Sequence, residues 1–229
     1  MTAISNHLID IMPRKERGRL LAICEPVELR LAEVLADSAT ITHHVYFPRD
    51  SFVSLFTSIE DSPVLEVGMI GSEGMLGTQI ALGVPQGGLH ARVQGEGSAW
   101  RLTTAQFKEE LGRNQGLRQT LNRYLQVTVL QLTSVARCIQ FHDIDHRFAR
   151  WLLMTHDRAH EDTFDVTHES IAFMLGVRRV GVTQAAGDLQ RRGVIEYARG
   201  EVTVIDRQAL EAAACSCYAS DISCYAKYL

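Results

Sequence analysis

Two arginine pairs within one short helical stretch are the sequence feature that most clearly suggests a chemical task. The stretch "MLGVRRVGVTQAAGDLQRRG" spans residues 174–193 of a chain whose formal net charge is −4. Between residues 176 and 200 the arginines outnumber the carboxylates, and this window alone is net +3. A local excess of positive charge is what binding to a polyanion requires, whatever the charge of the whole chain. We therefore expect this segment to bind nucleic acid rather than to form a solvated helix face. The charged residues of the window are Arg178, Arg179, Arg191, Arg192, Arg199, Asp188 and Glu196.

The same stretch has the spacing of a helix-turn-helix. Thr167 is a good N-cap for a first helix, and Gly176 is suited to end it. Ala172 lets a second helix approach, Gly176 permits the tight turn, and Val182 is expected to be buried between the two helices. The segment "GVIEYARGEVTVID" then predicts a two-stranded wing that turns at its Arg-Gly pair.

The residue types on the second helix predict two different contacts with DNA. Arginine and glutamine form bidentate hydrogen bonds with guanine and adenine, and the N-terminal part of a recognition helix meets base edges. The second arginine pair lies more than a turn farther along and is expected to contact phosphates. The predicted DNA-binding residues are Thr167, His168, Arg178, Arg179, Gly181, Thr183, Gln184, Arg191 and Arg192.

The elements that position this segment begin with a strand-rich region. Residues 29–102 contain short runs of Val, Phe, Tyr and Ile broken by Gly and Pro, which is typical of an antiparallel barrel or sandwich. A small helix is expected around residues 13–24, with Pro13 in its first turn. "LHARVQGEGSAWRL" adds a strand pair, and Thr103 with Gln106 forms a capping-box pattern where the helical part begins.

The longest helical pattern follows, over residues 115–139. Its apolar residues alternate at spacings of four and three, which is typical of a helix that pairs with another helix. Pairing with a second copy of the chain is favoured, and a core helix packed on its own barrel is the alternative. Asp143 is a good N-cap for the next helix. The predicted pairing residues are Leu121, Leu125, Thr128, Leu132, Val135 and Ile139.

Several classes of protein are not expected. No run of about eighteen apolar residues occurs, so we expect no membrane span. The first residues lack the pattern of a secretory signal, and a cytoplasmic protein is expected. No nucleophile elbow, Walker loop or H-E-x-x-H pattern occurs, and we expect no enzyme.

The five cysteines do not follow the spacing of a metal site. Cys24 and Cys138 are isolated in apolar surroundings and are expected to be small buried thiols. Cys215, Cys217 and Cys224 match neither a C-x-x-C pair nor a zinc-finger pattern, so packing or incidental thiols are favoured over a metal or a disulfide.

Two histidine pairs have the i, i+4 spacing that can bind a metal on one helix face. These are His142 with His146, which straddles an expected helix start, and His156 with His160. Chance pairs are expected among nine histidines. We predict no metal site and no cofactor.

The order of barrel, long pairing helix and winged helix-turn-helix resembles the Crp/Fnr family of bacterial transcription regulators over nearly the whole chain. "VYFPRDSFVSL" resembles the family's early barrel strands, "IGSEGMLG" the start of its phosphate-binding cassette, and "FHDIDHRFARWLL" its hinge. "ESIAFMLGVRRVGVTQAAGDLQRRGVI" resembles its helix-turn-helix and is the most specific match. The resemblance implies an α+β fold with an N-terminal jelly-roll β-barrel of the cyclic-nucleotide-binding type over residues 1–114. A dimerisation helix and hinge (115–142) and a winged helix-turn-helix domain (143–229) would follow.

The chain departs from the family at the effector pocket. Glu73 can stand for the glutamate that holds the ribose, but the position of the phosphate-binding arginine holds Gly88 or Leu89. Arg92 lies past it. The resemblance therefore implies a degenerate pocket, which we expect not to bind cyclic nucleotides. Its expected residues are Gly71, Ser72, Glu73, Gly74, Met75, Leu89 and His90.

Two further departures concern the operator and oxygen sensing. Val180 follows Arg179, where members that bind the familiar family operator have a glutamate, so that operator is not assumed. Members with an oxygen-sensing iron–sulfur cluster carry a cysteine group near the N-terminus, where this chain has only Cys24.

We therefore predict a homodimeric, sequence-specific DNA-binding transcription regulator that responds to an unknown effector or to none. The implied partners are double-stranded DNA, a second copy of the chain and, as a further candidate, RNA polymerase. A shift in the placement of two recognition helices, transmitted through the 115–139 helix and the hinge near Asp143, would carry the signal. The alternative is a ligand-binding signalling module whose helix-turn-helix mediates protein contacts.

Overall fold

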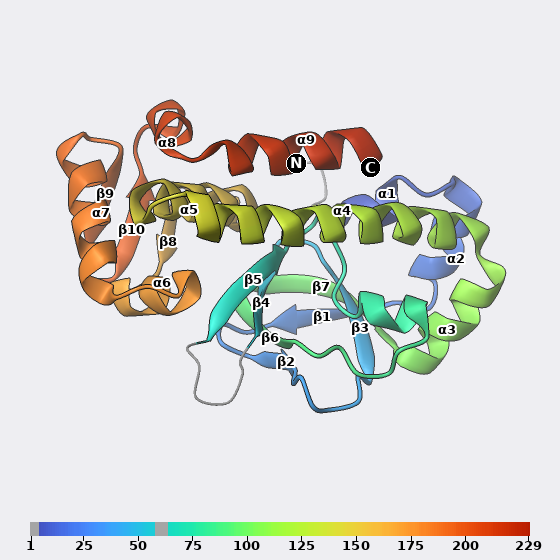
Figure 1. Ribbon diagram of the computed structural model, residues 1–229. Helices are drawn as coiled ribbons and strands as arrows, with labels where there is room; N and C mark the ends of the chain where they lie inside the picture. Colours follow the sequence, from blue (N-terminus) through green and yellow to red (C-terminus); the bar gives the residue numbers. More distant parts are fainter. Residues whose placement is uncertain (1–4, 58–63) are drawn as a thin grey trace. The chain divides into compact units, whose positions relative to one another are not determined.

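The computed structural model describes residues 5–57 and 64–229 (Figure 1). Its internal contacts divide it into two compact units. Unit 1 comprises Met1–Leu55, Met69–Val129 and Tyr225–Leu229, and unit 2 comprises Phe56–Gly68 and Leu130–Cys224. Within the described ranges, no helix combines the length and the apolar character that crossing a membrane requires.

The strands of the N-terminal region form two sheets. The three-stranded sheet has the order β1 (Glu25–Leu29), β7 (Gly97–Thr103), β3 (His44–Pro48). The four-stranded sheet has the order β2 (Val34–Ala36), β6 (His90–Gly95), β4 (Phe52–Thr57), β5 (Leu65–Ile70). The α+β class is confirmed, but the sheets of the described chain do not close into one barrel.

The two strands expected in "LHARVQGEGSAWRL" are present, but the prediction that they pair with each other is wrong. Strands β6 and β7 belong to different sheets, because the chain changes sheet at Gly97. This glycine has φ +144°, and a Cβ there would lie 2.8 Å from the Asp50 carboxylate oxygen, which accepts a hydrogen bond from the Ser98 amide. Only glycine accommodates this backbone and this close approach.

Short helices complete unit 1. Helix α1 spans His7–Asp10 and α2 spans Arg14–Leu21, with Pro13 as its N-cap rather than its first helical residue. A short 3₁₀ helix, η1, spans Thr78–Leu82, and α3 spans Thr104–Arg113. The capping box of Thr103 and Gln106 at the start of α3 is confirmed.

The predicted long helix is α4 (Gln115–Phe141). Leu121 is 1% exposed and belongs to the core of unit 1, so it is not available to a second chain. Leu125, Thr128 and Val135 are half-buried, whereas Leu132 and Ile139 are 44% and 40% exposed. The apolar surface of the helix thus lies mainly in its second half.

Unit 2 contains the winged helix-turn-helix. Asp143 caps α5 (Ile144–Ala159), as expected. Helices α6 (His168–Leu175), α7 (Arg179–Arg191), α8 (Arg207–Ala213) and α9 (Ser216–Tyr228) follow. The wing strands β9 (Ile195–Ala198) and β10 (Glu201–Val204) pair with each other, and β10 also pairs with an unexpected strand, β8 (Thr163–Asp165).

The wing turn has the conformation that its two residues favour. Arg199 has φ +55° and Gly200 has φ +90°, and two consecutive positive φ angles are typical of a type I′ hairpin turn. The predicted turn at this Arg-Gly pair is therefore confirmed.

Candidate nucleic-acid interface

Local signals in the sequence set where α6 begins and ends before α7. The Thr167 hydroxyl accepts a hydrogen bond from the Ser170 amide at 3.1 Å and caps α6. Gly176 ends α6 with φ +64°, the left-handed conformation that favours glycine. Ala172 and Val182 are buried where the helices meet. The predicted helix-turn-helix is present, residue for residue.

The N-terminal part of α7 offers an exposed face of mixed chemistry. Arg179, Val180, Thr183 and Gln184 are all exposed, and their spacing of one and four residues places them on one helix face. Arg178 precedes them as the N-cap. Guanidinium, methyl, hydroxyl and carboxamide groups together suit the edges of bases in a major groove.

His168 joins three elements of the domain. Its Nδ1 lies 3.1 Å from the Thr183 hydroxyl, and its ring stacks on Tyr197 of the wing with centroids 4.1 Å apart. Burial and the charge of Arg179 lower the pKa of His168. The Thr183 hydroxyl also donates to the Arg179 carbonyl at 3.1 Å. His168 therefore holds α6, α7 and the wing together, and its ring is engaged within the protein.

Gly181 faces the protein. A Cβ at this position would lie 2.8 Å from Ile144 Cδ1 on α5. Its role in the structure is to let α7 pack closely on α5, which sets the position of the exposed face.

The second arginine pair shares one carboxylate. Asp188 accepts hydrogen bonds from Arg191 at 3.0 Å and from Arg192 at 3.4 Å. These two hydrogen bonds, together with the charges of both arginines, lower the pKa of Asp188 despite desolvation. The side chains of Arg191 and Arg192 are 77% and 49% exposed. Both guanidinium groups can reach a phosphate, but Asp188 offsets part of their charge.

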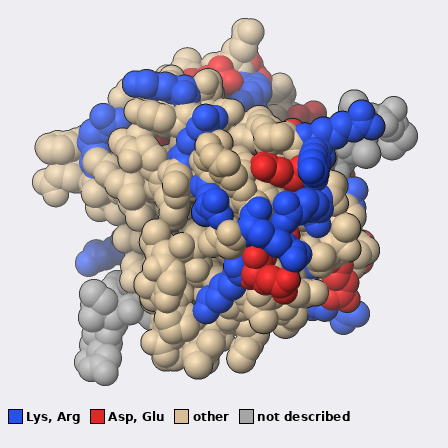
Figure 2. All heavy atoms as spheres, turned by 90° about the vertical axis from the view of Figure 1, so that its right-hand side faces the viewer, with Lys and Arg blue, Asp and Glu red and all other residues tan. Residues whose placement is uncertain are grey.

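A second set of basic residues lies in unit 1, over α2 and α3. Figure 2 shows Lys and Arg side chains on this face with Asp and Glu side chains among them. Arg19 lies 3.5 Å from the buried Glu110, which Arg113 also contacts at 2.7 Å, and Arg113 pairs with Glu109 at 2.9 Å. Carboxylates therefore balance much of this positive charge, and we do not assign the surface to DNA.

The expected effector residues lie in a tightly packed loop. Glu73 accepts a hydrogen bond from the Gly71 amide at 3.0 Å, and the Ser72 carbonyl accepts one from His7. Met75 is fully buried. A Cβ at Gly74 would lie 2.2 Å from the Tyr124 hydroxyl, so this glycine is required for packing.

The other two expected effector residues follow in the chain. Leu89 is half-buried, and His90 Nδ1 lies 3.6 Å from the Asp37 carboxylate. A hollow in unit 1 is lined by residues of 34–37 and 40–44, and its lining contains none of the expected effector residues.

One histidine of each i, i+4 pair contacts a carboxylate. His146 lies 2.5 Å from its own helix cap, Asp143, and His156 contacts Asp162 at 2.8 Å. His142 instead meets three cysteines, Cys138, Cys215 and Cys217, which the sequence analysis treated separately. The signals that could have found this group are an i, i+4 Cys-His pair and a C-x-C pair.

Comparison with known proteins supports the geometry of unit 2. Residues 146–213 match the model of the Crp-like helix-turn-helix domain. No curated protein matches the chain.

Solved structures resemble a larger part of the chain. It is similar to FixK2 from Bradyrhizobium japonicum, with 15% identity and a TM-score of 0.71, covering 84% of this chain and 98% of that chain. It is similar to the c-di-GMP responsive global regulator CLP of Xanthomonas campestris, with 15% identity and a TM-score of 0.68, covering 84% of this chain and 99% of that chain. It is also similar to a CRP-family transcriptional regulator from Thermus thermophilus, with 20% identity and a TM-score of 0.64, covering 82% of this chain and 96% of that chain. These likenesses establish the fold.

Proposed function

The chain has the fold of the Crp/Fnr transcriptional regulators and carries a Crp-like helix-turn-helix domain, and we propose that it is a sequence-specific DNA-binding regulator that acts as a homodimer. The observation that carries this proposal is the exposed N-terminal face of α7. Arg179, Val180, Thr183 and Gln184 lie there side by side. A recognition helix contacts base edges with this part of its surface.

Three of the four side chains on this face suit a base edge in the major groove. Arg179 suits guanine, and Gln184 suits adenine, through bidentate hydrogen bonds. Val180 is 61% exposed and carries two methyl groups, which suit the methyl group of thymine. Because the valine lacks a carboxylate, it cannot accept a hydrogen bond from cytosine, and we expect a different base preference from that of family members with glutamate here.

Arg191 and Arg192 position the domain on the duplex. Arg191 is the last residue of α7 and Arg192 is its C-cap, and their exposed positive charges suit phosphate contact. Such contacts contribute affinity for any sequence and make binding depend on salt.

The dimer proposal is supported by the apolar surface of α4. Val129, Leu132, Ile139 and Phe141 are each at least 40% exposed. Exposed large apolar side chains repeated along one long helix favour pairing with a second helix. Two copies related by a twofold axis would place their recognition helices on half-sites about 34 Å apart.

Selection from a pool of random DNA duplexes tests the proposal. The full chain should enrich a palindrome with half-sites about one helical turn apart. Arg179→Ala should lose the base preference at one position of the selected site, whereas Arg14→Ala, which changes an exposed arginine of α2 in unit 1, should keep it. No enrichment by the native chain, or equal losses in both variants, would contradict the proposal.

A further inference from the structure

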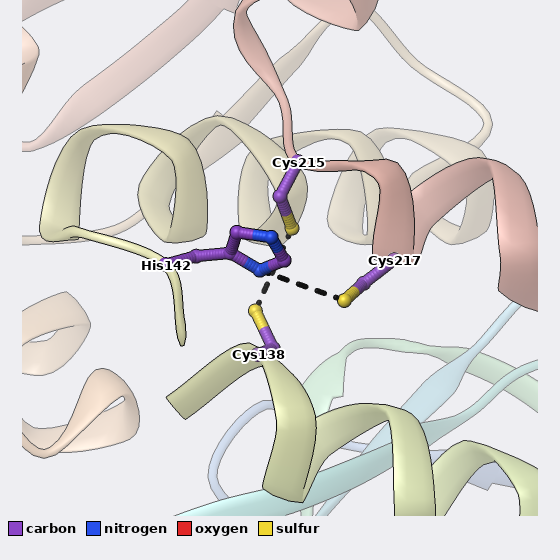
Figure 3. A group of neighbouring side chains, drawn as sticks. All are labelled: Cys138, His142, Cys215 and Cys217. Carbon is purple, nitrogen blue, oxygen red and sulfur yellow. Dashed lines mark hydrogen bonds between the residues drawn. The ribbon is translucent and has the colours of Figure 1, made fainter. Parts of the chain in front are cut away.

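Three cysteines and one histidine converge in unit 2. Cys138 lies on the last turn of α4, His142 follows that helix, and Cys215 and Cys217 lie at the start of α9 (Figure 3). Figure 3 shows the four side chains pointing toward one another. One ligand atom from each residue, a thiol sulfur or an imidazole nitrogen, lies within 4.8 Å of all the others.

We propose that these residues form a binding site for a single zinc ion, with Cys138, Cys215, Cys217 and His142 as its four ligands. Three thiolates and one imidazole are a common ligand set for structural zinc. The proposal is independent of the DNA-binding function, because it rests on a different group of residues.

Two of the distances within the group match the shell of one tetrahedral ion. With zinc–sulfur bonds of about 2.3 Å and zinc–nitrogen bonds of about 2.1 Å, ligand sulfurs lie about 3.8 Å apart, and sulfur and nitrogen about 3.6 Å apart. In the structure, Cys138 Sγ and Cys215 Sγ are 3.6 Å apart. Cys217 Sγ and His142 Nδ1 are also 3.6 Å apart. A cluster of several irons divides its ligands among different metal atoms and needs a wider cage.

Burial and charge around the group also suit a structural metal. Cys138, Cys215 and Cys217 are each at most 6% exposed and form a small buried cluster of their own. Three thiolates around a divalent ion carry a net negative charge, and Arg137 lies 3.7 Å from Cys217 Sγ, where it offsets that charge. Binding releases the protons of those thiols that are not already ionised.

The position of the group in the chain gives the metal a structural task. Two ligands precede the helix-turn-helix domain and two follow it, and Cys138 and Cys215 are 77 residues apart in the sequence. One ion would therefore join the end of α4 to the start of α9 and hold the two ends of the domain together. Because the four ligands come together only in the folded unit, zinc binding should stabilise unit 2.

Metal analysis of the purified full chain is the first test. We expect one zinc per chain by mass spectrometry after dialysis. Replacing zinc with cobalt should give the visible bands of a tetrahedral cobalt–thiolate centre. Because both measurements use the native chain, they do not depend on whether a variant folds.

Variants then assign the ligands. His142→Asn and Cys217→Ser should each lose the zinc, and His142→Asn is the milder change because His142 is only partly buried. Cys24→Ser and Cys224→Ser are matched controls outside the group and should keep one zinc.

Other outcomes would overturn the proposal. The proposal is refuted if the native chain contains no zinc and all its thiols react with a thiol reagent. A disulfide between Cys138 and Cys215 would also refute it. Iron together with acid-labile sulfide would show that the group holds an iron–sulfur cluster instead of zinc. Zinc that persists in both His142→Asn and Cys217→Ser would show that the metal lies elsewhere.

Discussion

Replacing Asp188 with asparagine should strengthen the binding of the chain to any DNA duplex. The Asp188 carboxylate lies 3.0 Å from Arg191 and 3.4 Å from Arg192, so it holds both guanidinium groups on the surface of α7. Hydrogen bonds from these arginines lower the pKa of Asp188, so the group is ionised at neutral pH and opposes an approaching phosphate. Asparagine keeps the size of the side chain and removes its charge.

The size of the effect follows from counterion release. Each phosphate that a cation neutralises contributes about 0.9 to the slope of log K against log salt concentration. If Asp188→Asn makes one more arginine fully available, the slope steepens by about 0.9. With equal binding of the two proteins at about 1 M salt, this slope raises the association constant of the variant about eightfold at about 0.1 M salt. The gain should be the same for cognate and unrelated sequences, because phosphates carry no base identity.

Fluorescence anisotropy across a range of salt concentrations measures both quantities. Glu109→Gln is the matched control, because Glu109 pairs with Arg113 at 2.9 Å along α3, outside the proposed interface. We expect the control to bind DNA like the native chain. An unchanged slope and affinity in Asp188→Asn would refute the proposal that Arg191 and Arg192 contact phosphates. A gain confined to the cognate sequence would refute their sequence-independent role.

Three further experiments test other parts of the proposal. Arg179→Ala should cost about 1–3 kcal/mol on the selected site and flatten the base preference at one position, as competition binding would reveal. Leu132→Asp should give a folded monomer by analytical ultracentrifugation, because Leu132 is 44% exposed in the single chain; a dimer of unchanged stability would exclude α4 as the interface. Calorimetry with cyclic AMP and cyclic GMP should detect no binding at micromolar concentration, because glycines and Leu89 replace the guanidinium that the cyclic phosphate requires. Micromolar binding abolished by Glu73→Ala would show an intact pocket.

The helix-turn-helix could be predicted because its signals are local. The cap at Thr167, the left-handed Gly176 and the Arg199–Gly200 turn each depend on a few neighbouring residues. Local chemistry of this kind constrains the backbone whatever the rest of the chain does. The helical repeat then shows which residues of α7 share its exposed face.

The errors arose where distant parts of the chain decide the outcome. Strands β6 and β7 are adjacent in sequence, and their apolar and polar residues alternate as in a hairpin. They nevertheless belong to different sheets, because the chain changes sheet at Gly97. Leu121 has the spacing of the pairing seam, yet it packs in the core of unit 1. Periodicity identifies an apolar face but does not say what covers it. Gly181 is a similar case, because only the fold shows that Ile144 lies against it.

The cysteine–histidine group shows why spacing rules miss a site of this kind. Each half, an i, i+4 Cys-His pair and a C-x-C pair, is too short to predict a metal site alone. In a zinc finger the ligands lie close in sequence and the metal organises the fold around it. Here the two halves meet only when the intervening helix-turn-helix domain has folded and brought α9 to the end of α4. Zinc affinity would then depend on the folded domain, and zinc would in turn stabilise that domain, because a ligand that binds only the folded state shifts the folding equilibrium by mass action.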